Sequence, residues 1–237
     1  MNQPQVELQD LGLIDYKECW DYQTKLFDSS VQLKIKNRKF PENKVATKNH
    51  LIFCEHPHVY TLGKSGDFKN LLIDGPKRKE KNISFYKINR GGDITYHGPG
   101  QLVVYPILDL DYFFSDIHKY LRLLEESVIL TLKDYGVAGQ RVDGFTGVWI
   151  DAEKENPRKI CAIGVKCSRW VTMHGIGFNI NSDLDYFNHI VPCGIEDKSV
   201  TSLQKETNQL IDMEELKHRF KKNFKILFDI NWIDKRK

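Results

Sequence analysis

Apolar residues recur at helical spacing in three stretches of the chain. Residues 15–33 show a loose helical period, and the polar run that follows, residues 34–49, predicts a surface loop. Residues 117–132 and 212–227 carry apolar side chains on one side at helical intervals. The pattern therefore predicts three helices.

The two later helices also have recognisable end signals. Ser115 is predicted to cap the helix over residues 117–132, and Gly136 is predicted to stop it. Asp212 and Glu215 are spaced like a capping box at the start of the last helix.

Short apolar runs typical of strands lie between the helices. Polar or Gly-containing turns separate the last three of them, which favours an antiparallel or mixed sheet over strict strand–helix alternation. The basic stretch KRKEKN (77–82) is predicted to be a loop tip. The predicted fold is α/β (α+β), one domain over residues 1–237 with helices packed on a mixed sheet. The predicted strands are HLIFCE, QLVVYPILDL, TGVWID, KICAIGVKC and WVTMHGIGFNI.

Composition and charge narrow the class of protein. The chain has 237 residues, 41% of them hydrophobic, which is enough to bury a core without disulfide or metal staples. Its 35 basic and 32 acidic residues give a net charge of +3, too balanced for a dedicated nucleic-acid-binding protein. No apolar stretch approaches the roughly 18 residues of a membrane span. We therefore expect no nucleic-acid partner and no membrane insertion.

The cysteines indicate a reducing compartment. They are odd in number and scattered, and the N-terminus has no signal-peptide pattern, so we expect a cytoplasmic protein. Cys54, Cys161 and Cys167 lie in apolar strand-like runs and are predicted to be core residues. Cys193 lies in the turn-like sequence VPCGI, which makes it the candidate nucleophile.

The sequence contains no complete cofactor-binding or metal-binding motif. A phosphate-binding loop ending at GKS (63–65) would need glycine at position 58, which is His58. The Gly-x-Gly segments at 98–100 and 175–177 lack the third glycine of a dinucleotide fingerprint. There is no HExxH and no CxxC pair. We expect neither a cofactor nor a metal.

Three segments hold more glycine and reactive side chains than a core requires: residues 90–101, 158–179 and 190–195. Paired glycines after Arg90 let the backbone come close to another group, although a tight turn is the commoner reason for Gly-Gly-Asp. His97 and His174 are interpreted as polar residues that hold the Gly-rich loops, with an acid–base role as the alternative.

The segments RGGDITYHGPGQL, RKICAIG, TMHGIGFNI and VPCGI, in this order and spacing, resemble the octanoyltransferase family of lipoate biosynthesis. The resemblance covers about residues 55–203 and implies the mixed-sheet fold of biotin and lipoate protein ligases. It also implies a catalytic pair, in which Cys193 carries the acyl group and Lys159 assists it. Lys166 is the nearby alternative, but the family commonly has Arg at that position.

The resemblance further implies a substrate pocket built from three segments. The last pocket position is usually Ala in the family, so Gly177 is expected to widen the pocket slightly. The implied substrate-binding residues are Arg90, Gly91, Gly92, Asp93, Ile94, Thr95, Tyr96, His97, Ala162, Ile163, Gly164, Gly175, Ile176 and Gly177.

The implied reaction moves an octanoyl group from octanoyl-acyl carrier protein to a lysine of a lipoyl domain, through a thioester on Cys193. The implied acceptors are lipoyl domains of 2-oxoacid dehydrogenases and the glycine cleavage H protein. Thioester exchange is nearly balanced in free energy and amide formation is downhill, so no ATP is required. Such partners are typically acidic, and the basic runs 77–81 and 217–225 could help them dock, although an exposed helix face also explains the second run.

Two alternatives remain at this stage. An ATP-dependent lipoate or biotin protein ligase would share the implied fold but would need no nucleophilic cysteine. A non-catalytic module that binds lipoyl domains is the other alternative.

Overall fold

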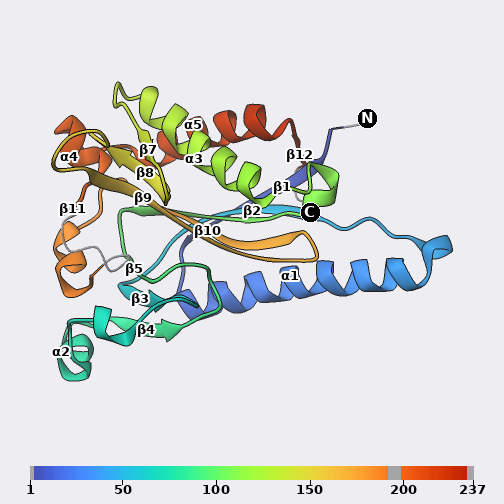
Figure 1. The fold of residues 1–237 in the computed structure, drawn as a ribbon, viewed down its shortest axis with the longest axis horizontal. Helices are drawn as coiled ribbons and strands as arrows, with labels where there is room; N and C mark the ends of the chain where they lie inside the picture. Colours follow the sequence, from blue (N-terminus) through green and yellow to red (C-terminus); the bar gives the residue numbers. More distant parts are fainter. Residues whose placement is uncertain (1–2, 192–198, 234–237) are drawn as a thin grey trace.

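The computed structural model describes residues 3–191 and 199–233, in which helices cover a large mixed β-sheet (Figure 1). The nine-stranded sheet has the order β12-β1-β2-β6-β10-β9-β8-β7, with β11 paired to β9. Pairing is parallel for β12-β1, β1-β2 and β11-β9, and antiparallel elsewhere. The strands are β1 (Gln5–Leu13), β2 (Asn49–Glu55), β6 (Gln101–Ile107), β7 (Gln140–Val142), β8 (Phe145–Ile150), β9 (Arg158–Ser168), β10 (Val171–Asn179), β11 (Ser199–Val200) and β12 (Asn231–Ile233).

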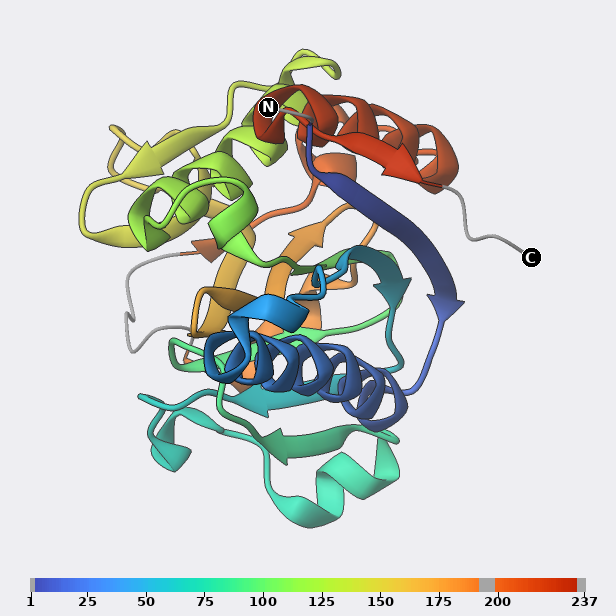
Figure 2. The same ribbon diagram turned by 90° about the vertical axis from the view of Figure 1, so that its right-hand side faces the viewer.

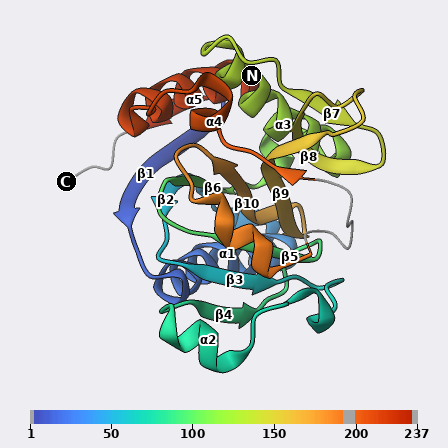
Figure 3. The same ribbon diagram turned by 90° about the vertical axis from the view of Figure 1, so that its left-hand side faces the viewer.

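A second, three-stranded sheet has the order β4-β3-β5. Its strands are β3 (Val59–Leu62), β4 (Ser84–Lys87) and β5 (Ile94–His97). It lies on the same side of the large sheet as α1 (Tyr16–Lys39), whereas α3 (Ile117–Lys133) and α5 (Met213–Phe228) lie on the other side (Figures 2 and 3). The mixed sheet with flanking helices confirms the predicted fold class.

Side-chain alternation on the central strands explains why helices cover both faces. Leu51 and Phe53 of β2 pack with α3 and α5, whereas Ile52 and Cys54 of the same strand pack with α1. Because successive strand residues point to opposite faces, a strand covered on both sides is apolar throughout. The continuous apolar run in β6 has the same origin, as the sequence predicts.

The three predicted helices are confirmed, with corrections at their ends. α1 continues to Lys39, six residues beyond the predicted end, and basic side chains in its last turn suit the negative end of the helix dipole. Asp116, not Ser115, caps α3, because its carboxylate accepts from the amides of His118 and Lys119. α3 ends at Lys133, and Gly136 follows with φ of 73°.

Only one of the two side-chain interactions of the predicted capping box forms at the start of the last helix. The Asp212 carboxylate accepts from the amides of Glu214 and Glu215. The Glu215 carboxylate instead accepts from Arg219 Nε at 3.1 Å, one turn further along the helix.

The loop predicted at residues 77–82 is wrong in part, since α2 (Gly75–Glu80) forms there. Asp74 caps it by accepting from the amide of Lys77, and Pro76 occupies the first turn, where its missing N–H has no cost. β1 has no counterpart among the predicted elements, because only Val6 and Gln9 of its nine residues are buried. Its short apolar pattern is too weak to predict a strand.

Of the cysteines predicted to be core residues, Cys54 and Cys161 are buried and Cys167 is exposed. Cys167 lies next to the end of β9, beside the turn at Arg169 and Trp170, so the prediction for this residue is wrong. Within residues 3–191 and 199–233, no helix combines the length and apolar character needed to cross a membrane.

The buried face of α5 provides a test of this packing. Phe224 is 0% exposed and stacks on Phe228 at 4.2 Å between ring centroids, whereas Ile226 on the opposite face is 64% exposed. Phe224→Ala should lower the free energy of unfolding in urea by about 3–5 kcal/mol, because it leaves a cavity against α3 and the sheet. Ile226→Ala, the matched control, should change it by less than about 0.5 kcal/mol. Equal effects of the two changes would contradict the assigned faces.

Candidate active site

A cavity of about 360 Å³ lies where β5, β6, β9 and β10 meet the N-terminal end of α1. This volume is near the lower end of the range of roughly 300–1,000 Å³ for small-molecule sites. Lys159 and most of the implied pocket residues line it, although they come from three separate segments. The predicted residues that line it are 90–95, His97, Lys159, 162–164 and 175–177.

The register of two strands makes room for the cavity. β9 and β10 pair so that Gly164 lies opposite Gly175, and Ala162 lies opposite Gly177. A methyl group at 175 would stand 2.2 Å from the carbonyl oxygen of Val104, and one at 164 would stand 2.7 Å from that of Gly91. Both distances are shorter than real contacts allow, so these positions accept only glycine without a shift of the backbone.

Gly177 has a different neighbourhood. A methyl group there would lie 3.2 Å from Gln101 Oε1 and 3.3 Å from His97 Cε1. The missing side chain leaves space beside the His97–Gln101 pair, and the slightly wider pocket stays a prediction.

Arg90 shapes the loop that carries the first group of lining residues. Its guanidinium donates to the carbonyl oxygens of Asp93 at 2.7 Å, Gly91 at 2.8 Å and Thr61 at 3.2 Å. The loop also lies directly on β9, where the amide of Gly91 donates to the carbonyl of Val165 at 3.0 Å. The paired glycines therefore serve a tight turn that approaches a strand.

Tyr96 is the implied pocket residue that the structure places behind the cavity. It is fully buried on the other face of β5, where its hydroxyl lies 2.8 Å from His58 Nδ1 and its ring stacks on Tyr186 at 5.2 Å. Its neighbours Thr95 and His97 line the cavity. Strand alternation separates these residues, and Tyr96 supports β5 from the core.

The two candidate lysines lie in different places. Lys159 is 8% exposed, lines the cavity, and has its Nζ 4.5 Å from the centroid of the Trp149 ring. Gly147, with φ of 124°, leaves room beside it, since a methyl group there would lie 3.5 Å from Lys159 Cε. Lys166 does not line the cavity, and its Nζ lies 4.6 Å from the Phe27 ring of α1.

Cys193 lies outside the described residues. On one side of it in the sequence, Val191 donates its amide to the carbonyl of Asn70 at 2.8 Å. On the other side, Val200 of β11 pairs with Lys159 and lines the cavity.

Two buried histidines of the cavity are held neutral. Burial, with the neighbouring His56, lowers the pKa of His97 to about 3. Burial, with the charge of Arg90, lowers the pKa of His174 to about 3. His174 has φ of 61°, an uncommon backbone conformation for a residue with a side chain, and its amide donates to Gln23 Oε1 on α1 at 3.2 Å.

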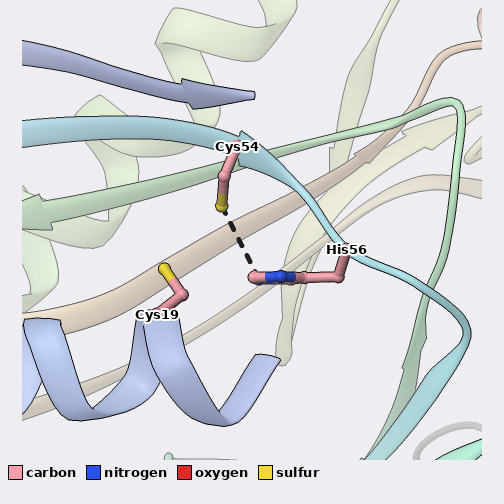
Figure 4. A group of neighbouring side chains, drawn as sticks. All are labelled: Cys19, Cys54 and His56. Atoms are coloured by element: carbon pink, nitrogen blue, oxygen red, sulfur yellow. Dashed lines mark hydrogen bonds between the residues drawn. The ribbon is translucent and has the colours of Figure 1, made fainter. Parts of the chain in front are cut away.

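Beside the cavity, Cys19, Cys54 and His56 form a buried thiol–imidazole group (Figure 4). Their possible ligand atoms lie within 4.8 Å of one another, a donor set that zinc accepts in proteins. In this structure hydrogen bonds satisfy the imidazole: Nδ1 lies 2.8 Å from the carbonyl of Ile14, and Nε2 lies 2.9 Å from the Tyr105 hydroxyl. Spacing along the chain does not reveal this group, because Cys19 comes from α1.

Several lining residues are absent from the implied pocket. Gln101 and His174 lie within or beside the Gly-rich segments, so the sequence contained a signal for them. Tyr16 comes from α1, which is far from these segments in the sequence, and no sequence signal pointed to it. The other lining residues not named above are Tyr105, Leu121, Gly144, Phe145, Thr146, Val165, Asn179, Phe187 and Val200.

Comparison with known proteins identifies the family of the chain. The family model for the lipoyl protein ligase A/B catalytic domain matches residues 15–225. The octanoyltransferase of Christiangramia forsetii is 60% identical over 225 residues, which cover 94% of this chain and 96% of that protein. The octanoyltransferase of Cytophaga hutchinsonii is 57% identical over 230 residues, covering 95% of this chain and 93% of that protein.

Among solved structures, a bi-partite lipoate protein ligase from Thermoplasma acidophilum has a TM-score of 0.71 at 15% identity and covers 98% of this chain and 87% of that one. That likeness confirms the lipoate ligase fold. The family model and the sequence relatives show that the chain belongs to the octanoyltransferase family of lipoyl protein ligase A/B catalytic domains.

Proposed function

We propose that this chain, as one catalytic domain over residues 1–237, transfers an octanoyl group from octanoyl-acyl carrier protein to a lysine of lipoyl domains. The proposed acceptors are those of 2-oxoacid dehydrogenases and the glycine cleavage H protein, in the cytoplasm. The observation that carries the proposal is the cavity in which Lys159 and other residues of two Gly-rich segments, 90–101 and 158–179, converge. Relatives at 57–60% identity bear the name octanoyltransferase.

The cavity suits an unbranched acyl chain. Ile163, Ile176 and Phe145 provide apolar lining, and the glycines of β9 and β10 keep the space open. Burial of a methylene group contributes about 0.8 kcal/mol, or roughly 5 kcal/mol for an octanoyl chain. This free energy is enough to retain the acyl group while one protein partner leaves and the other binds.

In the proposed mechanism, the Cys193 thiolate attacks the carbonyl carbon of the donor thioester. The new C–S bond replaces the old one, and the carrier leaves as a thiol after it gains a proton. The ε-amine of the acceptor lysine then attacks the acyl-enzyme, a C–N bond replaces the C–S bond, and the amine proton passes to the Cys193 sulfur. No step consumes ATP.

Lys159 is proposed to assist both steps. An ammonium about 4 Å from the sulfur would favour the thiolate by about 4 kcal/mol at an effective dielectric of 20. The same group can relay protons between the leaving thiol and the incoming amine. Its position between Trp149 and the cavity, rather than on the outer surface, supports this role.

The basic run of α2 is the candidate docking surface for acidic partners, since Lys77, Arg78 and Lys79 lie on a short helix without buried residues. The run at 217–225 belongs to α5, where Lys217 is 8% exposed and pairs with Asp10 and Glu214. That run therefore contributes partly to stability.

Acylation of Cys193 can be tested directly. Incubation with octanoyl-acyl carrier protein and no nucleotide should add the mass of one octanoyl group to the intact protein. Cys193→Ala should abolish this shift, and Cys167→Ala, which changes an exposed thiol, should retain it. A ligase needs no acyl-enzyme, so octanoylation of an apo-lipoyl domain only with free octanoate and ATP would indicate a ligase. No octanoylation of that domain under either condition would indicate a binding module.

The choice of lysine gives a second prediction. Lys159→Ala should slow formation of the acyl-enzyme by about 10²–10⁴-fold, the range for loss of a proton-transfer group. Lys166→Ala should have less than about a twofold effect, because its side chain lies against Phe27 outside the cavity. Rapid-quench mass spectrometry measures both rates, and the opposite order would assign the role to Lys166.

A further inference from the structure

The structure holds His97 in one tautomer through a chain of buried amides. His97 Nδ1 lies 2.6 Å from Gln101 Oε1. Gln101 Nε2 donates to the carbonyl oxygen of Tyr96 at 3.1 Å and to Asn179 Oδ1 at 2.9 Å. Asn179 Nδ2 in turn donates to the carbonyl oxygen of Thr201 at 3.0 Å.

The two backbone carbonyls fix the direction of every bond in this chain. A carbonyl oxygen only accepts, so Asn179 must turn its NH₂ group to Thr201, and Gln101 must turn its NH₂ group to Tyr96. Gln101 Oε1 then faces His97 as an acceptor, and Nδ1 must carry the hydrogen. Nε2 of the neutral ring is consequently an acceptor, and it makes no hydrogen bond to residues 3–191 or 199–233.

His97 also lies where a reacting group can reach it. It is 7% exposed and lines the cavity, and the missing side chain of Gly177 leaves uncovered the Cε1 atom of the ring, which is bonded to Nε2. The far end of the amide chain reaches Lys159, another lining residue of the same cavity, because the amide of Thr201 donates to the carbonyl of Lys159 at 3.0 Å. A continuous series of hydrogen bonds therefore links the His97 ring to the backbone of Lys159.

We propose that His97 is a catalytic residue of the second half-reaction, the transfer of the octanoyl group from the enzyme to the acceptor lysine. Its unprotonated Nε2 accepts a hydrogen bond from the acceptor amine. Gln101 is the positioning residue that keeps Nε2 unprotonated. This role rests on the proposed octanoyl transfer to a lysine. The bond orients the acceptor amine within the cavity. It also stabilises the positive charge that develops on nitrogen as the C–N bond forms, before the proton passes to the Cys193 sulfur.

The groups around His97 keep it an acceptor across the ordinary pH range. His56, Arg90 and His174 each add to the effect of burial in lowering its pKa to about 3. The ring also stacks on that of Tyr16 at 6.0 Å, and its hydrogen-bond partner Gln101 is neutral. The titratable or charged groups facing or lining this region are Tyr16, His56, Arg90, Asp93, Tyr105, Lys159 and His174.

Gln101→Glu tests the proposal. A carboxylate beside Nδ1 favours the imidazolium, so the pKa of His97 rises and Nε2 is protonated, hence unable to accept, at a higher pH than in the wild type. We consider the acidic limb of the pH profile, where the rate of transfer from octanoyl-enzyme to an apo-lipoyl domain falls as the pH is lowered. This limb should shift to a pH higher by about 1–3 units. The matched control is Gln9→Glu on β1, a buried glutamine whose Nε2 lies 3.3 Å from His50 Nδ1, outside the cavity. It should leave the limb in place.

His97→Asn provides a second measurement, because it removes Nε2. It should slow transfer of the octanoyl group about 10²-fold beyond any loss in the formation of octanoyl-enzyme. An unmoved limb in Gln101→Glu, or equal losses in both half-reactions of His97→Asn, would overturn the inference. Failure of the wild type to form octanoyl-enzyme would instead refute the proposed function itself.

Discussion

The pairing register of β9 and β10 is the constraint on which the site depends. With Gly164 opposite Gly175 and Ala162 opposite Gly177, four small residues meet at one place in an otherwise well-filled sheet. A slip of one residue would turn these positions to the other face and place larger side chains in the space. β10 also pairs with β6, so the same register fixes Gln101 opposite Asn179 and thereby the amide chain that reaches His97.

α1 completes the site from the side of the small sheet. Tyr16 in its first turn lines the cavity, and Gln23 two turns later holds the backbone amide of His174. Cys19 lies between them against Cys54. One helix thus supplies part of the cavity wall and supports an unusual backbone conformation in the central strand.

Sequence patterns predicted the parts of this fold in which periodicity is strong. The helices at α3 and α5 and the apolar strands β2, β6 and β10 bury regular faces, and their residues show it. β1 and α2 were missed because one buries too few side chains and the other depends on a capping Asp74 and Pro76 in a basic stretch. The site itself followed from the family resemblance, and even that could not show that Tyr96 turns to the core. The face of a sheet that a residue occupies depends on the strands with which its own strand pairs. Tyr16 and Cys19 are far in sequence from the other residues of the site and come close to them only in the folded chain.

The backbone contacts of Gly164 and Gly175 have a consequence for redesign of acyl-chain preference. Any side chain at either position would meet a main-chain oxygen, which cannot rotate away as a side chain can. Positions 162, 163 and 176 carry side chains already, and the nearest neighbours of Gly177 are side-chain atoms rather than backbone atoms. Libraries intended to lengthen or shorten the accepted chain are therefore best confined to these four sites, with 164 and 175 left unchanged as part of the scaffold.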